Sequence, residues 1–242
     1  MNKLPQRGSM GGNMENNNIT IMPIHYGMVY SYLLKVSEDN FSIIDCGRPG
    51  TENKILKVIS DLGLNKSKLK SIIITHGHSD HMGTCSELRK ATGAKTIIHK
   101  MDSDSVRKGE NVEIIPANRI GRLLCHFGTE IKGFCPYEPE IIIKGDFPLY
   151  DFGIPGKIIE TPGHTKGSVS VLLDDGNLFI GDLIMGGMIS KGKPKLPMFA
   201  CDLNLVKENI KKIISLSPKM VYTGHGGSFT CEEIKQCMKD IN

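Results

Sequence analysis

The sequence contains no long hydrophobic run. No stretch of about 18 consecutive apolar residues, the length that a transmembrane helix needs, occurs among its 242 residues. The first segment, MNKLPQRGSMGGNMENNN, also lacks the apolar centre of a secretory signal peptide. We therefore expect a cytoplasmic protein without a membrane anchor, in which residues 1–18 form a flexible polar tail.

Paired cysteines and an excess of one charge are missing as well. The seven cysteines form no C-x-x-C pair, and their odd number argues against a disulfide framework. Free thiols in a reducing cytoplasm are the simpler interpretation. The 30 basic and 26 acidic residues leave a net charge of +4, spread along the chain. This charge is too small and too scattered to require a nucleic acid, although it does not exclude one. We expect a small-molecule substrate as the partner and no membrane.

What the sequence does contain is an alternation of strand and helix patterns. Short β-branched or aromatic runs predict strands at 19–24, 28–35, 41–45, 71–75, 94–99, 157–160, 168–173, 177–181 and 220–223. Helical periodicity follows Thr51 and Asp202, and Thr230 with Glu233 forms a capping box before the last helix. Early hairpins followed by strand–helix alternation predict one mixed α/β domain over residues 19–242. Residues 101–139 show no clean period, and we expect an irregular or partly helical insertion there.

Histidine and aspartate are concentrated at predicted strand ends. The stretch ITHGHSDHMG, residues 74–83, follows one strand directly, and TPGHTKGS, LFIGD and MVYTGHGG place further such residues after three others. The seven side chains are His76, His78, Asp80, His81, His164, Asp182 and His225. Because ligands gather at the carboxyl ends of strands in α/β folds, we expect these side chains to share one crevice.

Metal binding is the chemistry that fits these residue types. Imidazole and carboxylate together suit zinc, iron or manganese, and no cysteine lies within the set. Seven ligands are too many for one tetrahedral ion and enough for two. Two ions about 3.5–4 Å apart can share a carboxylate and a hydroxide, which is an arrangement that hydrolyses carbonyl or phosphoryl esters. Zinc is the first choice because it needs no redox protection, and iron or manganese stays open.

The strings THGHSDH, TPGHTKGS, GD and TGHG, in this order, resemble the signature of the metallo-β-lactamase-fold hydrolase superfamily over residues 19–235. The resemblance implies an α+β or α/β fold, a four-layer αββα sandwich with the metal site along one edge. It implies one metal on His76, His78 and His164, and a second on Asp80, His81 and His225. Asp182 would bridge the two ions. Asp45, in IIDCGRPG, would support the site from behind, the alternative being a plain turn aspartate.

The same resemblance separates the subfamilies. Class B1 β-lactamases place a cysteine on the second metal and class B3 enzymes lack the bridging aspartate, so Asp182 argues against penicillin hydrolysis. Flavodiiron oxygen reductases have a glutamate where His78 stands, which disfavours redox chemistry. The ligand set is that of glyoxalase II, but the 17 residues after His225 are too few for its glutathione-binding helical domain. A compact relative that acts on another thioester stays open.

The resulting hypothesis is a dinuclear metal-dependent hydrolase. A metal-bridging hydroxide, oriented by Asp80, would attack the carbonyl carbon of an ester, lactone or thioester. The alternative is a phosphodiesterase or nuclease with the same ions, whose binding of polyanions should weaken steeply as salt increases.

The insertion at 101–139 is the expected source of substrate specificity. Long loops that join strand ends often contain the specificity residues of a rigid scaffold, and this one combines apolar with basic side chains. As a lid it would offer Ile120, Leu123, Leu124, Phe127 and Phe134 beside Arg119, Arg122 and Lys132. A structural cap over the sheet is the alternative. His99, His126, Tyr137 and the loop 191–197 are weaker site candidates, for which ordinary packing or solvation is the preferred interpretation.

Overall fold

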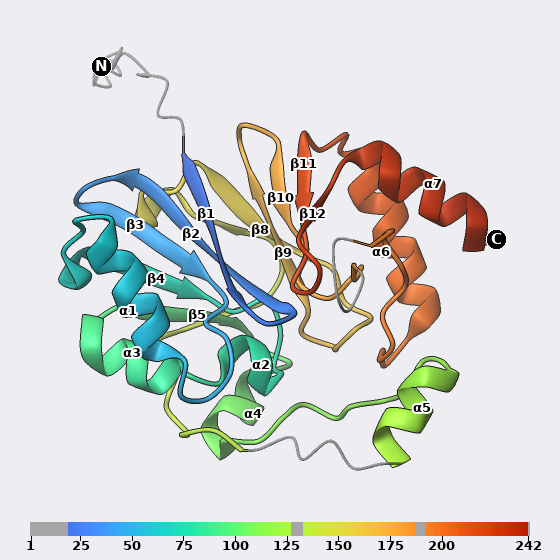
Figure 1. Ribbon diagram of the computed structural model, residues 1–242, viewed down its shortest axis with the longest axis horizontal. Helices are drawn as coiled ribbons and strands as arrows, with labels where there is room; N and C mark the ends of the chain where they lie inside the picture. Colours follow the sequence, from blue (N-terminus) through green and yellow to red (C-terminus); the bar gives the residue numbers. More distant parts are fainter. Residues whose placement is uncertain (1–18, 127–132, 187–191, 242) are drawn as a thin grey trace, which may run out of the picture.

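The computed structural model describes residues 19–126, 133–186 and 192–241, and it contains two six-stranded sheets (Figure 1). The first sheet has the spatial order β1 (Thr20–Tyr26), β2 (Val29–Ser37), β3 (Asn40–Ile44), β4 (Leu69–Ile73), β5 (Lys95–His99) and β6 (Ile141–Ile143). Strands β1 to β3 form an antiparallel meander, whereas β3 to β6 are parallel. The carboxyl ends of β4, β5 and β6 therefore lie at the same edge.

The second sheet is mostly antiparallel. Its spatial order is β12 (Ser228–Phe229), β11 (Met220–Tyr222), β10 (Asn177–Phe179), β9 (Val169–Leu173), β8 (Gly156–Glu160) and β7 (Phe147–Pro148). Only the β10–β11 pair is parallel. Because β9 is antiparallel to both β8 and β10, the strands β8, β10 and β11 all run in one direction. Their carboxyl ends therefore meet at one edge of the sheet.

Helices cover the outer face of each sheet, which gives four layers. The helices α1 (Glu52–Asp61) and α3 (Cys85–Thr92) pack on the first sheet, and α6 (Leu203–Ser215) and α7 (Cys231–Ile241) pack on the second. Successive residues of β4 show the layering, because Ile72 belongs to the core under the helices and Ile73 to the core between the sheets. The continuous apolar runs of the sequence are thus strands that are buried on both faces. The expected αββα sandwich is confirmed.

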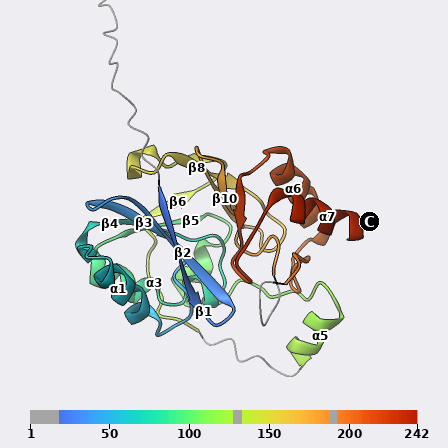
Figure 2. The same cartoon turned by 45° about the horizontal axis from the view of Figure 1, so that its top comes forward.

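The segment between β5 and β6 is partly helical, as expected. It contains α4 (Ser103–Lys108) and α5 (Arg119–His126), which are joined by extended chain. It runs along the edge where α2 (Ser79–Met82) lies, and both views place α5 on the side of α6 and α7 (Figure 2). Two single 3₁₀ turns, Lys66–Lys68 and Tyr150–Phe152, complete the elements. No helix within the described ranges is long and apolar enough to cross a membrane.

Two of the three predicted helix caps form, and the third does not. The capping box is confirmed, because the Thr230 amide donates to Glu233 Oε2 at 2.7 Å and the Glu233 amide donates to Thr230 Oγ1 at 3.2 Å. Asp202 Oδ1 accepts hydrogen bonds from the amides of Asn204 and Leu205, so it caps α6. The Thr51 hydroxyl instead donates to the Arg48 carbonyl at 2.7 Å, and it does not cap α1.

We predict that Asp202→Ala lowers the free energy of unfolding by about 1 kcal/mol, because two amides at the start of α6 lose their acceptor. Urea unfolding of the wild-type and variant proteins measures this difference. Glu208→Ala, at an exposed position in the middle of the same helix, is the matched control and should change stability by less than about 0.5 kcal/mol. Equal effects of the two substitutions would contradict the capping role.

Candidate metal centre

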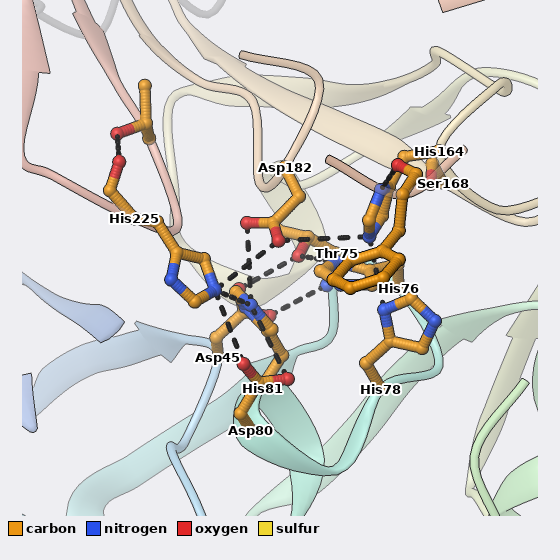
Figure 3. A network of polar contacts seen from close by, with 12 residues as sticks. Asp45, Thr75, His76, His78, Asp80, His81, His164, Ser168, Asp182 and His225 are labelled. Atoms are coloured by element: carbon orange, nitrogen blue, oxygen red, sulfur yellow. Dashed lines mark hydrogen bonds and ion pairs between the residues drawn. The ribbon is translucent and has the colours of Figure 1, made fainter. Parts of the chain in front are cut away.

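Four strand ends meet at one edge of the sandwich and deliver all seven expected side chains to one cluster (Figure 3). The loop and short helix after β4 contribute four of them, and the loops after β8, β10 and β11 contribute one each. The seven residues are His76, His78, Asp80, His81, His164, Asp182 and His225. The first sheet therefore supplies four ligand candidates and the second sheet supplies three.

The cluster divides into two outer groups. His76, His78 and His164 form the first group, whose donor atoms lie within 4.8 Å of one another, and His164 Nε2 is 3.1 Å from His78 Nδ1. The second group consists of Asp80, His81 and His225. In it, His225 Nε2 lies 3.3 Å from His81 Nε2 and 3.2 Å from Asp80 Oδ2. These are the two triads that the sequence analysis expected.

Asp182 lies between the two groups. Its Oδ2 atom is 3.7 Å from His164 Nε2 in the first group and 3.3 Å from His225 Nε2 in the second. Its Oδ1 atom is 3.4 Å from His81 Nε2. One carboxylate therefore faces both groups, which is the placement that a bridging ligand needs.

Three atoms of the cluster that could bind a metal are buried without a hydrogen-bond partner. They are His76 Nε2, His78 Nε2 and Asp182 Oδ1. A buried polar atom without a partner costs about 1–3 kcal/mol, so three of them in one place need compensation. Nitrogen and oxygen donors at this spacing match the preferences of zinc and similar divalent ions. The residues present thus fit a metal.

Burial sets the protonation of the first group. It lowers the pKa of His76 well below its ordinary value, lowers that of His78 to about 3, and lowers that of His164. Neighbouring histidines add to the effect for His76 and His78, because like charges oppose protonation. All three rings are therefore neutral near pH 7, which leaves a lone pair for a metal.

The acids of the cluster are ionised. Burial alone would raise the pKa of Asp80 and of Asp182, but the surrounding histidines outweigh it and hold both values below the ordinary range. For His81, burial lowers the pKa and the nearby carboxylates, with Asp182 first, raise it well above its usual value. The second group is therefore held together by opposite charges.

Asp45 supports the second group from behind. Its Oδ1 accepts from the Thr75 amide, and its Oδ2 accepts from the Thr75 hydroxyl, both at 2.8 Å. The same Oδ2 lies 2.8 Å from His81 Nδ1, which directs His81 Nε2 into the cluster. Asp45 adopts a φ of 56°, a left-handed conformation that aspartate tolerates better than most residues. It therefore orients a ligand candidate and is more than a turn residue.

Close packing of the backbone explains one of the glycines. A Cβ atom at Gly224 would lie 2.3 Å from Asp182 Oδ1 and 2.5 Å from His81 Cε1. Any side chain at this position would displace the carboxylate between the two groups.

The weaker candidates lie outside the cluster. His99 Nε2 is 2.8 Å from Glu160 Oε1, and the two residues line a separate cavity of about 320 Å³. Tyr137 and Phe134 are buried in the core under α1 and α3, so the expectation that Phe134 lines a substrate pocket is wrong. His126 ends α5 and is exposed. Phe127, Lys132 and Lys191 lie outside the described residues.

Sequence reasoning missed two residues of the insertion that contact the loops of the cluster. Asn111 Oδ1 accepts from the amide of Ser79, next to His78, at 2.6 Å. Asp102 is 1 % exposed and accepts three hydrogen bonds from the loops around His76 and His164. Both lie in a segment without periodicity, and their partners are 25 or more positions away, so no local pattern identifies them.

The comparison with protein families agrees with this geometry. Residues 26–225 match the family model of the metallo-beta-lactamase superfamily. The chain belongs to this superfamily. As a member, it is a hydrolase of the metallo-β-lactamase fold with a His/Asp metal-binding cluster.

Curated relatives of similar length extend the match. The probable metallo-hydrolase YflN of Bacillus subtilis is 26% identical over 240 residues, which cover 91% of this chain and 88% of the relative. The hydroxyacylglutathione hydrolase GloC of Haemophilus influenzae is 27% identical over 216 residues, which cover 88% of this chain and 92% of the relative.

Solved structures show the same fold. The archaeal superfamily protein ST1585 from Sulfolobus tokodaii has a TM-score of 0.65 at 23% identity, with 94% of this chain and 87% of that chain covered. The B3 metallo-β-lactamase BLEG-1 has a TM-score of 0.65 at 21% identity, with 90% and 96% covered.

We predict that Asp182→Ala reduces the metal content of the purified protein to one ion per chain or less. If Asp182 bridges two ions, its removal would leave two cations close together without their common counter-charge. Asp182→Asn retains an oxygen donor and should keep at least one ion. Inductively coupled plasma mass spectrometry measures the content, and Asp151→Ala at an exposed site is the control. An alanine variant with full metal content would show that Asp182 is not a ligand.

Proposed function

We propose that the protein is a dinuclear metal-dependent hydrolase that cleaves an ester, lactone or thioester at its carbonyl carbon. The observation on which this proposal rests is the pair of His/Asp groups that face the single Asp182 carboxylate. In this proposal His76, His78 and His164 bind one ion, and Asp80, His81 and His225 bind the other. Zinc is the first choice, and iron or manganese suits the same donors.

Bound divalent ions supply Lewis acidity and lower the pKa of water to about 7. The chain itself supplies orientation and proton transfer. Asp80 has a side chain that is 30% exposed, whereas those of Asp182 and His225 are 6% and 12% exposed. Asp80 is therefore the acid of the cluster that solvent and substrate reach most easily. Its ionised carboxylate would orient the attacking water and accept a proton from it during the attack. It would then pass that proton to the leaving group as the bond from the carbonyl carbon to that group breaks.

The relatives support a thioester or a related acyl substrate. The similarity to the hydroxyacylglutathione hydrolase GloC covers 92% of that protein and 88% of this chain. A protein named as a thioester hydrolase can therefore be about as short as this chain. The short stretch after His225 is therefore no argument against thioester hydrolysis. The substrate class proposed here is an acyl compound with an activated leaving group.

Purified protein that has not met a chelator should contain close to two metal ions per chain, because seven donors converge. It should hydrolyse members of a panel of lactones and thioesters, and a strong chelator followed by desalting should abolish this activity. Elemental analysis and a colorimetric assay measure the two quantities. A reproducible single ion would contradict the dinuclear proposal. A preference for bis-phosphodiesters, with binding that weakens steeply with salt, would favour the nuclease alternative.

We also propose that the insertion at 101–139 contributes to substrate binding. Its extended part is tied to the metal-binding edge, because Val112 donates to the Gly77 carbonyl and Ala117 donates to the Met198 carbonyl. The next residue, Phe199, accepts from His164 Nδ1 at 2.8 Å. Helix α5 follows directly and exposes Ile120 and Leu123 by 54% and 56%. We propose that these two side chains contact an apolar part of the substrate.

Replacing both exposed residues, as in Ile120→Ala with Leu123→Ala, should raise KM roughly tenfold for a substrate with a long acyl chain, since apolar contact is lost. The metal content should stay that of the parent. Leu216→Ala, at a leucine exposed by 42% elsewhere, is the control. Steady-state kinetics across acyl lengths measures the effect. Unchanged KM for every substrate would mean that α5 is only a structural cap.

A further inference from the structure

We propose that Asp102 is a positioning residue that fixes the two loops of the first histidine group relative to each other. The inference rests on the metal site of the proposed function. Asp102 begins the turn into α4 and is 1 % exposed. Its Oδ2 accepts from the Gly77 amide at 2.8 Å, and Gly77 lies between His76 and His78.

The same carboxylate binds the other loop of that group. Oδ2 also accepts from the Thr165 hydroxyl at 2.6 Å, and Oδ1 accepts from the Gly167 amide at 2.9 Å. Thr165 directly follows His164 in the sequence. One buried carboxylate thus joins the segment of His76 and His78, which follows a strand of the first sheet, to the segment of His164, which follows a strand of the second.

The chemistry of these contacts requires a carboxylate. Three donors converge on two oxygens, and none of the three is a cation. Burial raises the pKa of Asp102, and the three hydrogen bonds, which favour the charged form, oppose this effect. An amide has only one oxygen acceptor, so asparagine would present an NH₂ group to at least one donor.

Two glycines show that the loops are built around Asp102. A Cβ atom at Gly167 would lie 2.4 Å from Asp102 Oδ1 and 2.5 Å from its Cγ. The backbone of Gly167 is not in the left-handed region, so the close carboxylate, and not the conformation, excludes a side chain. At Gly77, a Cβ would lie 3.1 Å from Asp102 Cβ, besides closer contacts with Val112 and Ser105.

Asp102 and Asp45 divide the support of the centre between them. Asp45 binds Thr75 and His81, and thereby orients the second group. Asp102 contacts no ligand candidate directly and acts through the backbone on either side of His76, His78 and His164. Loss of an outer hydrogen-bond partner commonly weakens metal binding about 10–100-fold. We expect loss of the Asp102 carboxylate to weaken metal binding by this factor. The weakening should affect the ion held by His76, His78 and His164.

The first test measures zinc affinity of the full chain by competition with a chromogenic chelator. Asp102→Asn should weaken one of the zinc-binding steps about 10–100-fold, and Thr165→Val, which removes one of the three bonds, should weaken the same step less. Asp104→Asn, an exposed aspartate in the same helix, should leave the affinity unchanged. The melting temperature of each metal-free protein is recorded in parallel. Asp102→Asn with wild-type zinc affinity, whatever its melting temperature, would overturn the inference.

The second test uses the glycine contact. Gly167→Ala alone should displace the carboxylate and weaken zinc binding. In an Asp102→Ala background it should have a smaller further effect, because the two closest contacts are gone and only the contact with the Asp102 backbone nitrogen, at 2.9 Å, remains. Equal weakening in both backgrounds would show that Gly167 matters for another reason and would overturn the coupling. Failure of the metal site itself looks different, since the wild-type protein would then bind no zinc in either experiment. Failure of the hydrolase proposal would appear in the substrate panel and would leave both zinc measurements unchanged.

Discussion

The central constraint on this molecule is the burial of potential metal-ligating atoms that have no hydrogen-bond partner within the described chain. His76 Nε2, His78 Nε2 and Asp182 Oδ1 have no hydrogen-bond partner in the interior, and among the described residues only the ion-pair contact with His81 Nε2, at 3.4 Å, faces Asp182 Oδ1. The acids of the cluster remain ionised there. Such an arrangement costs several kcal/mol unless something else compensates. The surrounding structure keeps it in place through hydrogen bonds on the outer side of three of the ligand candidates. Asp45 binds His81, the Phe199 carbonyl binds His164, and Thr75 Oγ1 lies 3.0 Å from His76 Nδ1.

The sandwich makes this arrangement rigid. Strands β4, β8 and β10 are packed in cores that are closed by helices or by the other sheet, so their ends have little freedom. The ligand candidates follow these strands within a few residues, and glycine lets the loops approach closely where a side chain would collide with Asp182. Because the two sheets contribute to one cluster, the relative position of the sheets sets the geometry of the site. Hydrogen bonds between the loops of the two sheets, above all those of Asp102, therefore help to set the positions of the ligand candidates.

The candidate site could be predicted from the sequence because its signals are local. Four of the seven residues lie within six positions after one strand, and the others each follow a strand with glycine nearby. The four layers came from the resemblance, since alternation of strands and helices alone does not distinguish a sandwich from an open sheet. The role of Asp102 could not be predicted from the sequence because its partners are 25, 63 and 65 positions away. The prediction that Phe134 lines a pocket is wrong because an aperiodic segment gives no indication of which apolar side chains face the core.

X-ray absorption spectroscopy of the purified holoprotein, at the edge of the metal that it contains, tests the central claim most directly. The account predicts a first shell of nitrogen and oxygen only, together with metal–metal scattering at about 3.5–4 Å. Of the two described cysteines nearest in sequence to the ligand candidates, Cys85 is buried in the core under α1 and α3, and Cys231 Sγ donates to the Ile214 carbonyl. No candidate ligand group among the described residues includes a cysteine, so no sulfur should contribute. A sulfur shell at about 2.3 Å, or a metal without a second metal nearby, would contradict the account.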